Sequence, residues 1–178
     1  MYLVDTNGIS TGAPSKAVIA AELLNWMDER SAKLHLSAVT VSEIEDGIAK
    51  ARRGKAERKA ADLTAWLETV LHLYGDRVLA FDIAAARVAE RLSDLERSKG
   101  LSPGFADIVI GATARAHGLI ILTRNTRHFE PLSLATINPF QVAVRQLNSA
   151  GQTSFSSADP VPGPPPTNEP IVTSRAGP

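Results

Sequence analysis

Three acidic residues lie in apolar stretches of the chain, where a charge is costly unless it has a partner. Asp5 directly follows the first apolar run, Glu43 follows the largely apolar passage 36–42, and Asp107 lies within the apolar segment 105–112. A buried carboxylate without a partner costs several kcal/mol or becomes protonated. The three residues are therefore candidates for one shared site that carries chemistry.

A divalent cation is the partner that would let three carboxylates share a pocket. Two like charges about 4 Å apart repel by about 4 kcal/mol at an effective dielectric constant near 20, so facing carboxylates need a cation or a proton. Oxygen ligands suit Mg²⁺ or Mn²⁺, whereas zinc normally takes sulfur or imidazole. The chain has no cysteine, and its four histidines show no paired spacing. The sequence therefore favours magnesium or manganese, and the histidines are interpreted as surface or packing residues.

Each acid also has a structural interpretation that the residues alone leave open. Asp5 could cap the turn that follows it. Glu43 could complete a capping box in which Thr40 is the N-cap residue of a helix. Asp107 could be an ordinary acid of a first helical turn, where the helix dipole favours negative charge.

A polar loop follows the last well-defined apolar run. The segment 122–129 presents a hydroxyl, an amide and two guanidinium groups together, which belong to Thr123, Asn125, Arg124 and Arg127. Arginine pairs bidentately with phosphate, and Asn125 could hold a metal-bound water or a ligand oxygen. The loop could equally be an exposed connection with ordinary polar residues.

Length and charge indicate one folded domain with no overall attraction to polyanions. The chain has 178 residues, 44% of them hydrophobic, and 19 basic residues balance 19 acidic ones. Zero net charge argues against a general drive toward nucleic acid or anionic membrane, although a local patch is still possible. The basic stretch 50–59 could track an RNA backbone, and a solvated helical hairpin explains it equally well.

The chain shows no signal for a membrane or for export. No stretch approaches the roughly 20 apolar residues that cross a bilayer, and no charged leader precedes an apolar core at the N-terminus. We therefore expect a cytoplasmic protein that does not bind membranes.

The candidate acids must be positioned by an α/β fold. Within residues 1–140, short apolar runs alternate with stretches of helical period, which is typical of a short parallel β-sheet flanked by helices on both faces. Ligands bind at the carboxyl ends of the strands in such sheets, and Asp5 ends the first strand. The expected strands are Tyr2–Asp5, Leu34–Ser37, Val78–Phe81, Leu119–Leu122 and, more weakly, Leu134–Ile137.

Two helices and a tail complete the expected organisation. Amphipathic helices are predicted over Ala17–Glu29 and around Leu63–Leu71, with Trp26 and Trp66 as core anchors, and Asp82 is predicted to cap a further helix. Residues 141–178 contain seven of the 11 prolines. This low-complexity tail is expected to be disordered and is separated from the domain 1–140.

Four segments of the chain carry short motifs, namely 3–7, 41–44 followed by Gly47, 106–108 with 112–114, and 122–125 before Phe129. Any one motif is weak, but four in the correct order form a specific signal over about residues 1–140. Together they resemble one known family, the PIN-domain ribonucleases, and within it the VapC-like toxins and plasmid-stability proteins of toxin–antitoxin modules.

The resemblance implies a metal-dependent endoribonuclease that acts as a toxin. Asp5, Glu43 and Asp107 would hold Mg²⁺ or Mn²⁺ and hydrolyse RNA phosphodiester bonds together with Asn125. Many relatives have a fourth acid near the position of Asn125, so one negative charge is missing here. The residues that would orient these groups or touch the substrate are Thr6, Asn7, Thr123 and Arg124.

The resemblance also implies partners: an RNA substrate, a cognate antitoxin, a homodimer, and a heterotetramer or larger assembly with the antitoxin. Two other functions stay open. A non-cleaving PIN-like module that binds RNA or an antitoxin would suit the neutral Asn125. A metal-dependent phosphatase also places an aspartate at the end of a strand, but such sites need a second aspartate where Asn7 stands.

Overall fold

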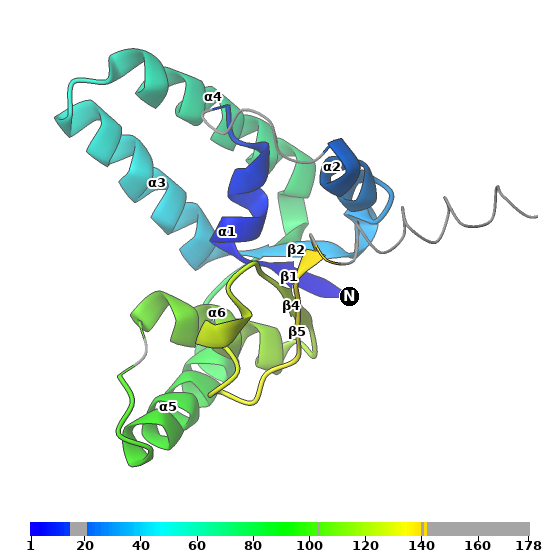
Figure 1. Ribbon diagram of the computed structural model, residues 1–178, viewed down its shortest axis with the longest axis vertical. Coiled ribbons are helices and arrows are strands. Elements are labelled where there is room, and N and C mark those ends of the chain that lie inside the picture. Colours follow the sequence, from blue (N-terminus) through cyan, green and yellow to red (C-terminus); the bar gives the residue numbers. More distant parts are fainter. Residues whose placement is uncertain (15–20, 103, 140, 142–178) are drawn as a thin grey trace, which may run out of the picture.

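The structure is a computed structural model, and it describes residues 1–14, 21–102, 104–139 and 141 (Figure 1). Short strands alternate with helices along the chain. The strands are β1 (Tyr2–Val4), β2 (Leu34–Ser37), β3 (Val78–Leu79), β4 (Ile120–Leu122) and β5 (Thr136–Ile137). The α-helices are α1 (Thr6–Ile9), α2 (Ala21–Asp28), α3 (Ala38–Arg53), α4 (Glu57–Tyr74), α5 (Ile83–Ser98) and α6 (Phe105–Ala116).

The strands form one parallel sheet in the order β3-β2-β1-β4-β5. The central strand β1 pairs with β2 on one side and β4 on the other, and Leu3 lies opposite both His35 and Ile121. All five expected strands are present, which confirms the α/β prediction. The strand expected to reach Phe81 ends at Leu79, because the chain leaves the sheet toward Asp82, the N-cap residue of α5.

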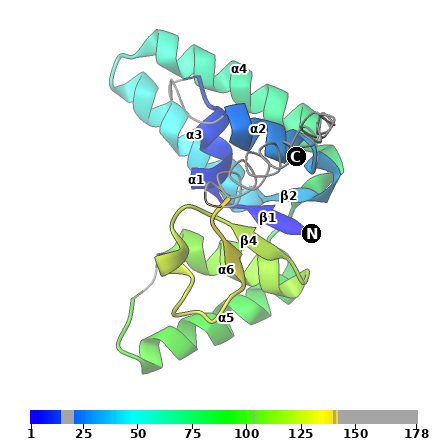
Figure 2. The ribbon, with the colours of Figure 1, turned by 45° about the vertical axis from the view of Figure 1, so that its right-hand side comes forward.

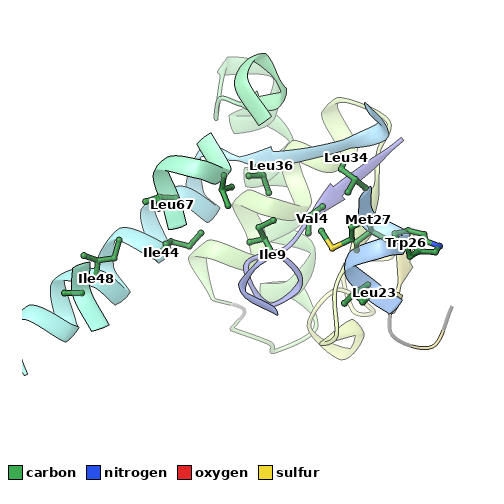
Figure 3. Close-up of a cluster of buried hydrophobic side chains, with 13 residues drawn as sticks. Val4, Ile9, Leu23, Trp26, Met27, Leu34, Leu36, Ile44, Ile48 and Leu67 are labelled. Atoms are coloured by element: carbon green, nitrogen blue, oxygen red, sulfur yellow. The ribbon is translucent and has the colours of Figure 1, made fainter. Parts of the chain in front are cut away.

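Two hydrophobic cores cover the two faces of the sheet. Successive side chains of a strand point to opposite faces, so Val4 and Leu122 pack in one core while Leu3 and Ile121 pack in the other. The first core also takes side chains from α1 to α4 (Figure 3), and the second takes them from α5 and α6. The helices therefore form two layers, and the carboxyl ends of β1 and β4 lie where these layers meet.

Two of the helix predictions are confirmed and one is wrong. Trp26 is buried in the first core, and the partly buried Trp66 packs against this core. The Asp82 side chain accepts a hydrogen bond from the Ala85 amide at 2.8 Å. The predicted cap Thr40 is instead a fully buried residue inside α3. Ser37, the last residue of β2, caps this helix by accepting from the Val39 amide at 3.2 Å.

Parts of two predictions lie outside the described residues. The helix expected over Ala17–Glu29 is present as α2, but its first residues, 17–20, are not described. The tail expected to be disordered is likewise not described beyond Gln141. No helix among the described residues has the length and apolarity that a membrane span requires.

Candidate active site

Asp5 lies at the centre of the candidate site, at the carboxyl end of the central strand. Its side chain is only 5% exposed. One carboxylate oxygen, Oδ1, accepts from the Thr6 amide at 2.7 Å, and the other, Oδ2, accepts from the Thr123 hydroxyl at 2.8 Å. The residue also caps α1, so the structural and the functional interpretation apply to the same side chain.

Burial raises the pKa of Asp5 above its ordinary value, because the charged form loses hydration. Hydrogen bonds from Thr123, Thr6 and Asn7 act in the opposite direction, and the negative charge of Asp107 raises the pKa further. A nearby cation would therefore stabilise the ionised form of the Asp5 carboxyl group. This is the property expected of a metal ligand.

Glu43 is an exposed residue of α3, and it contacts the same turn as Asp5. Its Oε2 accepts from the Thr6 hydroxyl at 2.5 Å. The predicted capping box with Thr40 is therefore wrong: the Thr40 hydroxyl is buried and has no hydrogen-bond partner among the described residues. Thr6 orients two acids at once, Asp5 through its backbone amide and Glu43 through its hydroxyl.

Asp107 lies in the first turn of α6 and is held by a chain of three polar side chains. Its Oδ2 lies 3.1 Å from His128 Nδ1, and His128 Nε2 lies 2.8 Å from Asn125 Nδ2. Arg127 Nε donates to Asn125 Oδ1 at 2.9 Å. Because arginine can only donate, the amide of Asn125 must turn its NH₂ group to His128. A neutral His128 then accepts at Nε2 and donates from Nδ1 to Asp107.

Thr123 connects this chain of polar side chains, the relay from Asp107 through His128 to Asn125, to Asp5. Its fully buried hydroxyl donates to Asp5 and accepts from the backbone amide of Asn125 at 2.9 Å. Thr123 therefore orients other groups and has no exposed surface for a substrate. Arg124, the next residue, is exposed.

Sequence reasoning placed Arg127 with Arg124 in a polar loop that could face phosphate, but it missed the place of His128 in the site. His128 is 42% exposed, as a surface residue would be, but it contacts Asp107, which lies 21 positions away in the sequence. The available signal was its position three residues after Asn125, in a loop that leaves a strand.

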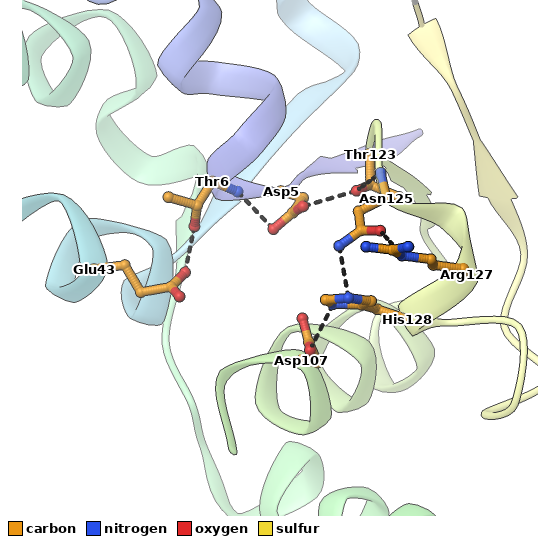
Figure 4. Close-up of polar contacts among 8 residues, drawn as sticks. All are labelled: Asp5, Thr6, Glu43, Asp107, Thr123, Asn125, Arg127 and His128. Atoms are coloured by element: carbon orange, nitrogen blue, oxygen red, sulfur yellow. Dashed lines mark hydrogen bonds and ion pairs between the residues drawn. The ribbon is translucent and has the colours of Figure 1, made fainter. Parts of the chain in front are cut away.

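Figure 4 shows Glu43, Asp5 and Asp107 directed toward the same region from α3, the end of β1 and α6. Thr6 links the first pair, and an electrostatic interaction couples Asp5 to Asp107. In the part of the chain that the structure describes, no three His, Asp or Glu side chains are close enough together to hold a metal ion by themselves. The acids thus meet at one edge of the sheet without forming a closed set of ligands.

This open arrangement fits Mg²⁺ or Mn²⁺. The available donors are carboxylate oxygens, and the two oxygens of Asp5 accept hydrogen bonds from Thr6, Thr123 and Asn7, which leaves one of about four lone pairs for a cation. Mg²⁺ usually keeps several waters and binds through one or two carboxylates together with substrate phosphates. A closed cage of protein ligands is therefore unnecessary.

The fold and this edge of the sheet define the class of protein. A model of the PIN domain matches residues 2–132, and the chain belongs to the PIN-domain family. It is 34% identical over 142 residues to the plasmid stability protein StbB of Pseudomonas syringae, an alignment that covers 79% of this chain and 99% of that protein. It is 37% identical over 147 residues to the VapC ribonuclease Y4jK of Sinorhizobium fredii, covering 80% and 100%.

Solved structures show the same relationship. The crystal structure of FitAcB from Neisseria gonorrhoeae contains a chain that superposes with a TM-score of 0.68 at 33% identity, covering 79% of this chain and 99% of that one. The toxin FitB of this organism is 31% identical over 144 residues, covering 79% of this chain and 99% of that protein. The DNA-bound VapBC of Salmonella typhimurium, with a TM-score of 0.65 and 21% identity over 76% of this chain and 96% of that one, shares the fold. The resemblance to PIN-domain toxins is confirmed.

Proposed function

We propose that this protein is a Mg²⁺- or Mn²⁺-dependent endoribonuclease and the toxin of a toxin–antitoxin module. One observation carries the proposal: a buried carboxylate, Asp5, ends the central strand, and Glu43 and Asp107 are directed toward it from the two helical layers. Relatives at 30% identity or more include proteins named as ribonucleases and toxins. Metal-dependent hydrolysis of RNA would account both for the arrangement of the three acids and for the names of these relatives.

In this proposal the three acids hold the cation, and their neighbours hold the acids. A bound divalent ion would offset phosphate charge and lower the pKa of an attacking water. Thr6 and Thr123 fix both oxygens of Asp5, and His128 fixes one oxygen of Asp107. The side chain of Asn125 is neutral, which leaves one negative charge fewer, so we propose one tightly held metal ion.

The positive groups of the loop after β4 would meet the RNA backbone. Arg124 and Arg127 are both exposed beside Asn125, and a guanidinium group can donate two parallel hydrogen bonds to a phosphate. Arg127 already uses Nε to hold Asn125, so its terminal nitrogens are the ones that would contact the substrate. Asn7, exposed beside Asp5, would complete this side of the site.

The partners follow from the relatives. FitB-like and VapC-like chains are solved in complexes named FitAB and VapBC, and some of these are bound to DNA. We propose that this chain likewise forms a homodimer and assembles with a cognate antitoxin into a heterotetramer or a larger complex. It would act on RNA in the cytoplasm.

Cleavage of RNA by the purified, antitoxin-free chain tests the function. We expect cleavage with Mg²⁺ or Mn²⁺, no cleavage in chelator, and a loss of more than about 100-fold in Asp5→Asn, because an ionised metal ligand is removed. Cleavage that survives both chelation and this substitution would refute the proposal. Metal-independent retention of RNA without cleavage would instead identify a non-cleaving binding module.

A further inference from the structure

The turn between α3 and α4 carries a concentration of positive charge that the proposed catalytic groups do not use. Six basic residues lie between positions 50 and 59 against one acidic residue, a local excess of five in a chain with no net charge. Such an excess attracts polyanions locally even when the whole molecule is neutral. The basic residues are Lys50, Arg52, Arg53, Lys55, Arg58 and Lys59.

A groove of about 510 Å³ connects this hairpin with the candidate active site. Thr6 and Glu43 line one part of it, and Lys50 and Lys59 line another. Figures 1 and 2 show α1, which carries Thr6, beside the α3–α4 hairpin. The groove therefore begins where Glu43 would take part in catalysis and continues between α1 and the hairpin.

One face of α3 forms a wall of this groove. Glu43, Gly47 and Lys50 are spaced by four and three residues, which places them on the same face of the helix. Lys50 lies seven positions after Glu43, which corresponds to about 10 Å along the helix axis. A Cβ atom at Gly47 would meet nothing within 4 Å, so the wall between the acid and the lysine is open.

The two lysines of the groove are not committed to other partners. Lys50 and Lys59 are exposed and form no hydrogen bond or ion pair within the described residues, whereas Arg53 lies 3.8 Å from Asp46 and Arg52 donates to the Thr64 hydroxyl. An exposed ammonium group without a protein acceptor binds phosphate as a point charge.

We propose that this groove binds the RNA backbone on one side of the cleaved bond, with Lys50 and Lys59 each neutralising a phosphate. The assignment rests on the proposed function. When one phosphate of a polyanion reaches the acids, its next phosphates must lie within a short distance of Glu43. The groove supplies open space and two uncommitted cations at that place.

The salt dependence of RNA binding tests the assignment. A fluorescein-labelled single-stranded RNA would be titrated with the full chain in EDTA, where cleavage is blocked, at several KCl concentrations. Lys50→Gln/Lys59→Gln removes two phosphate contacts. The negative slope of log K against log salt should therefore become shallower by about 1.4, and the affinity at 0.1 M salt should fall by about 25-fold. Arg87→Gln/Arg91→Gln removes the same charge from α5, on the opposite layer, and should leave both values unchanged.

A second variant blocks the groove without removing charge. Gly47→Gln replaces a helix-interior glycine by a better helix former in open space, so its melting temperature should equal or exceed that of the parent. We nevertheless expect RNA affinity to fall several-fold, with Gly47→Ala closer to the parent. A stabilised variant that binds less RNA is a result that a purely structural role for the groove does not produce.

The outcomes separate this inference from the proposed function. If the parent cleaves RNA but Lys50→Gln/Lys59→Gln keeps its affinity and salt slope, the groove assignment is wrong and the function stands. If the parent does not cleave RNA but both groove variants lose affinity, the nuclease function is wrong, and the groove binds the RNA backbone in a protein that does not cleave it. Unchanged RNA binding together with lost binding of a labelled polyglutamate peptide would overturn the RNA assignment in favour of an acidic protein segment.

Discussion

Asp5 and Asp107 face the same region but are held in different ways. Asp5 is buried and is fixed by a backbone amide and by the fully buried hydroxyl of Thr123. The side chain of Asp107 is 27% exposed and is fixed through His128, which in turn depends on other exposed groups. The fold itself places the first acid, whereas a surface relay places the second.

Because the two acids are held differently, we expect substitutions around them to differ in their effects on the stability of the fold and on RNA cleavage. Groups that hold Asp5 belong to the core, so their loss should affect both folding and catalysis. Groups that hold Asp107 are solvated and contribute little to folding, so their loss should affect catalysis alone. Substitutions on the two sides can therefore confirm or break the distinction.

The largest combined effect is expected from Thr123→Val. Valine keeps the shape of the side chain but leaves an oxygen of buried Asp5 and the Asn125 amide without their partner. We expect a loss of about 2 kcal/mol in the free energy of unfolding, because unsatisfied buried polar groups cost about 1–3 kcal/mol each. Cleavage should fall by about 10- to 100-fold, the usual effect of losing a group that orients a metal ligand. Denaturant unfolding and RNA cleavage measure the two losses.

Thr113→Val is the matched control. Thr113 is also fully buried, but its hydroxyl donates to the Val109 carbonyl within α6, at 2.8 Å, and serves no acid. We expect a cost below about 1 kcal/mol, because only an additional bond within a helix is removed. If both variants lose the same stability and activity, Thr123 has no special role in holding Asp5.

The next effect is expected from His128→Ala, on the opposite side of the comparison. Loss of the hydrogen bond to Asp107 should lower cleavage by about 10- to 100-fold. The free energy of unfolding should stay within about 0.5 kcal/mol of the parent value, as is usual for surface substitutions. Arg127→Ala, which acts through Asn125, should give a smaller loss of the same kind.

His117→Ala provides the control for the relay. His117 is exposed at the other end of α6 and lies outside the site. Its substitution should change neither cleavage nor stability. Full activity in His128→Ala, or a loss of several kcal/mol in its stability, would show that Asp107 is not held as described.

The smallest effect is a dependence of stability on pH at Asp5. Burial raises its folded-state pKa above the ordinary value of 3.8. Between these two pKa values the folded state binds more protons than the unfolded state, so the free energy of unfolding falls as pH rises and the penalty is complete above the folded-state pKa. In chelator at pH 7, Asp5→Asn should therefore melt above the parent, and the difference should shrink as pH is lowered toward 4.

Melting of both proteins across this pH range measures the effect. An Asp5→Asn variant that melts below the parent by the same amount at every pH would contradict the prediction. The hydrogen bonds from Thr6 and Thr123 would then outweigh the cost of burying the charge.

The sequence predicts the fold better than it predicts helix starts. Apolar runs identify all five strands, because β1, β2 and β4 are mostly buried between the two helical layers and the edge strands β3 and β5 are partly buried. The cap of α3 was predicted wrongly because Thr40 and Glu43 match the spacing of a capping box. The true partner of Glu43 is Thr6, which lies 37 positions away, and local spacing contains no information about such a contact.

The site shows the same limit. The three acids could be predicted as site residues because a charged residue in an apolar segment is unusual. Thr123 and Asn125 could be predicted because they follow a strand. The relay through His128 could not be predicted, since it depends on how the loop after β4 folds back over α6. Site residues that follow a strand or interrupt an apolar segment can be predicted from the sequence, whereas contacts that depend on the conformation of a loop cannot.

The melting temperature with and without Mg²⁺ tests most directly whether the acids share one cation. Free ion at about 100 times its dissociation constant should add about 2.7 kcal/mol to the free energy of unfolding of the parent. Asp5→Asn, Glu43→Gln and Asp107→Asn should each lose this gain, and Glu45→Gln, an exposed neighbour on α3, should keep it. If the three variants are stabilised by Mg²⁺ as much as the parent, the acids do not form a metal site and the account is wrong.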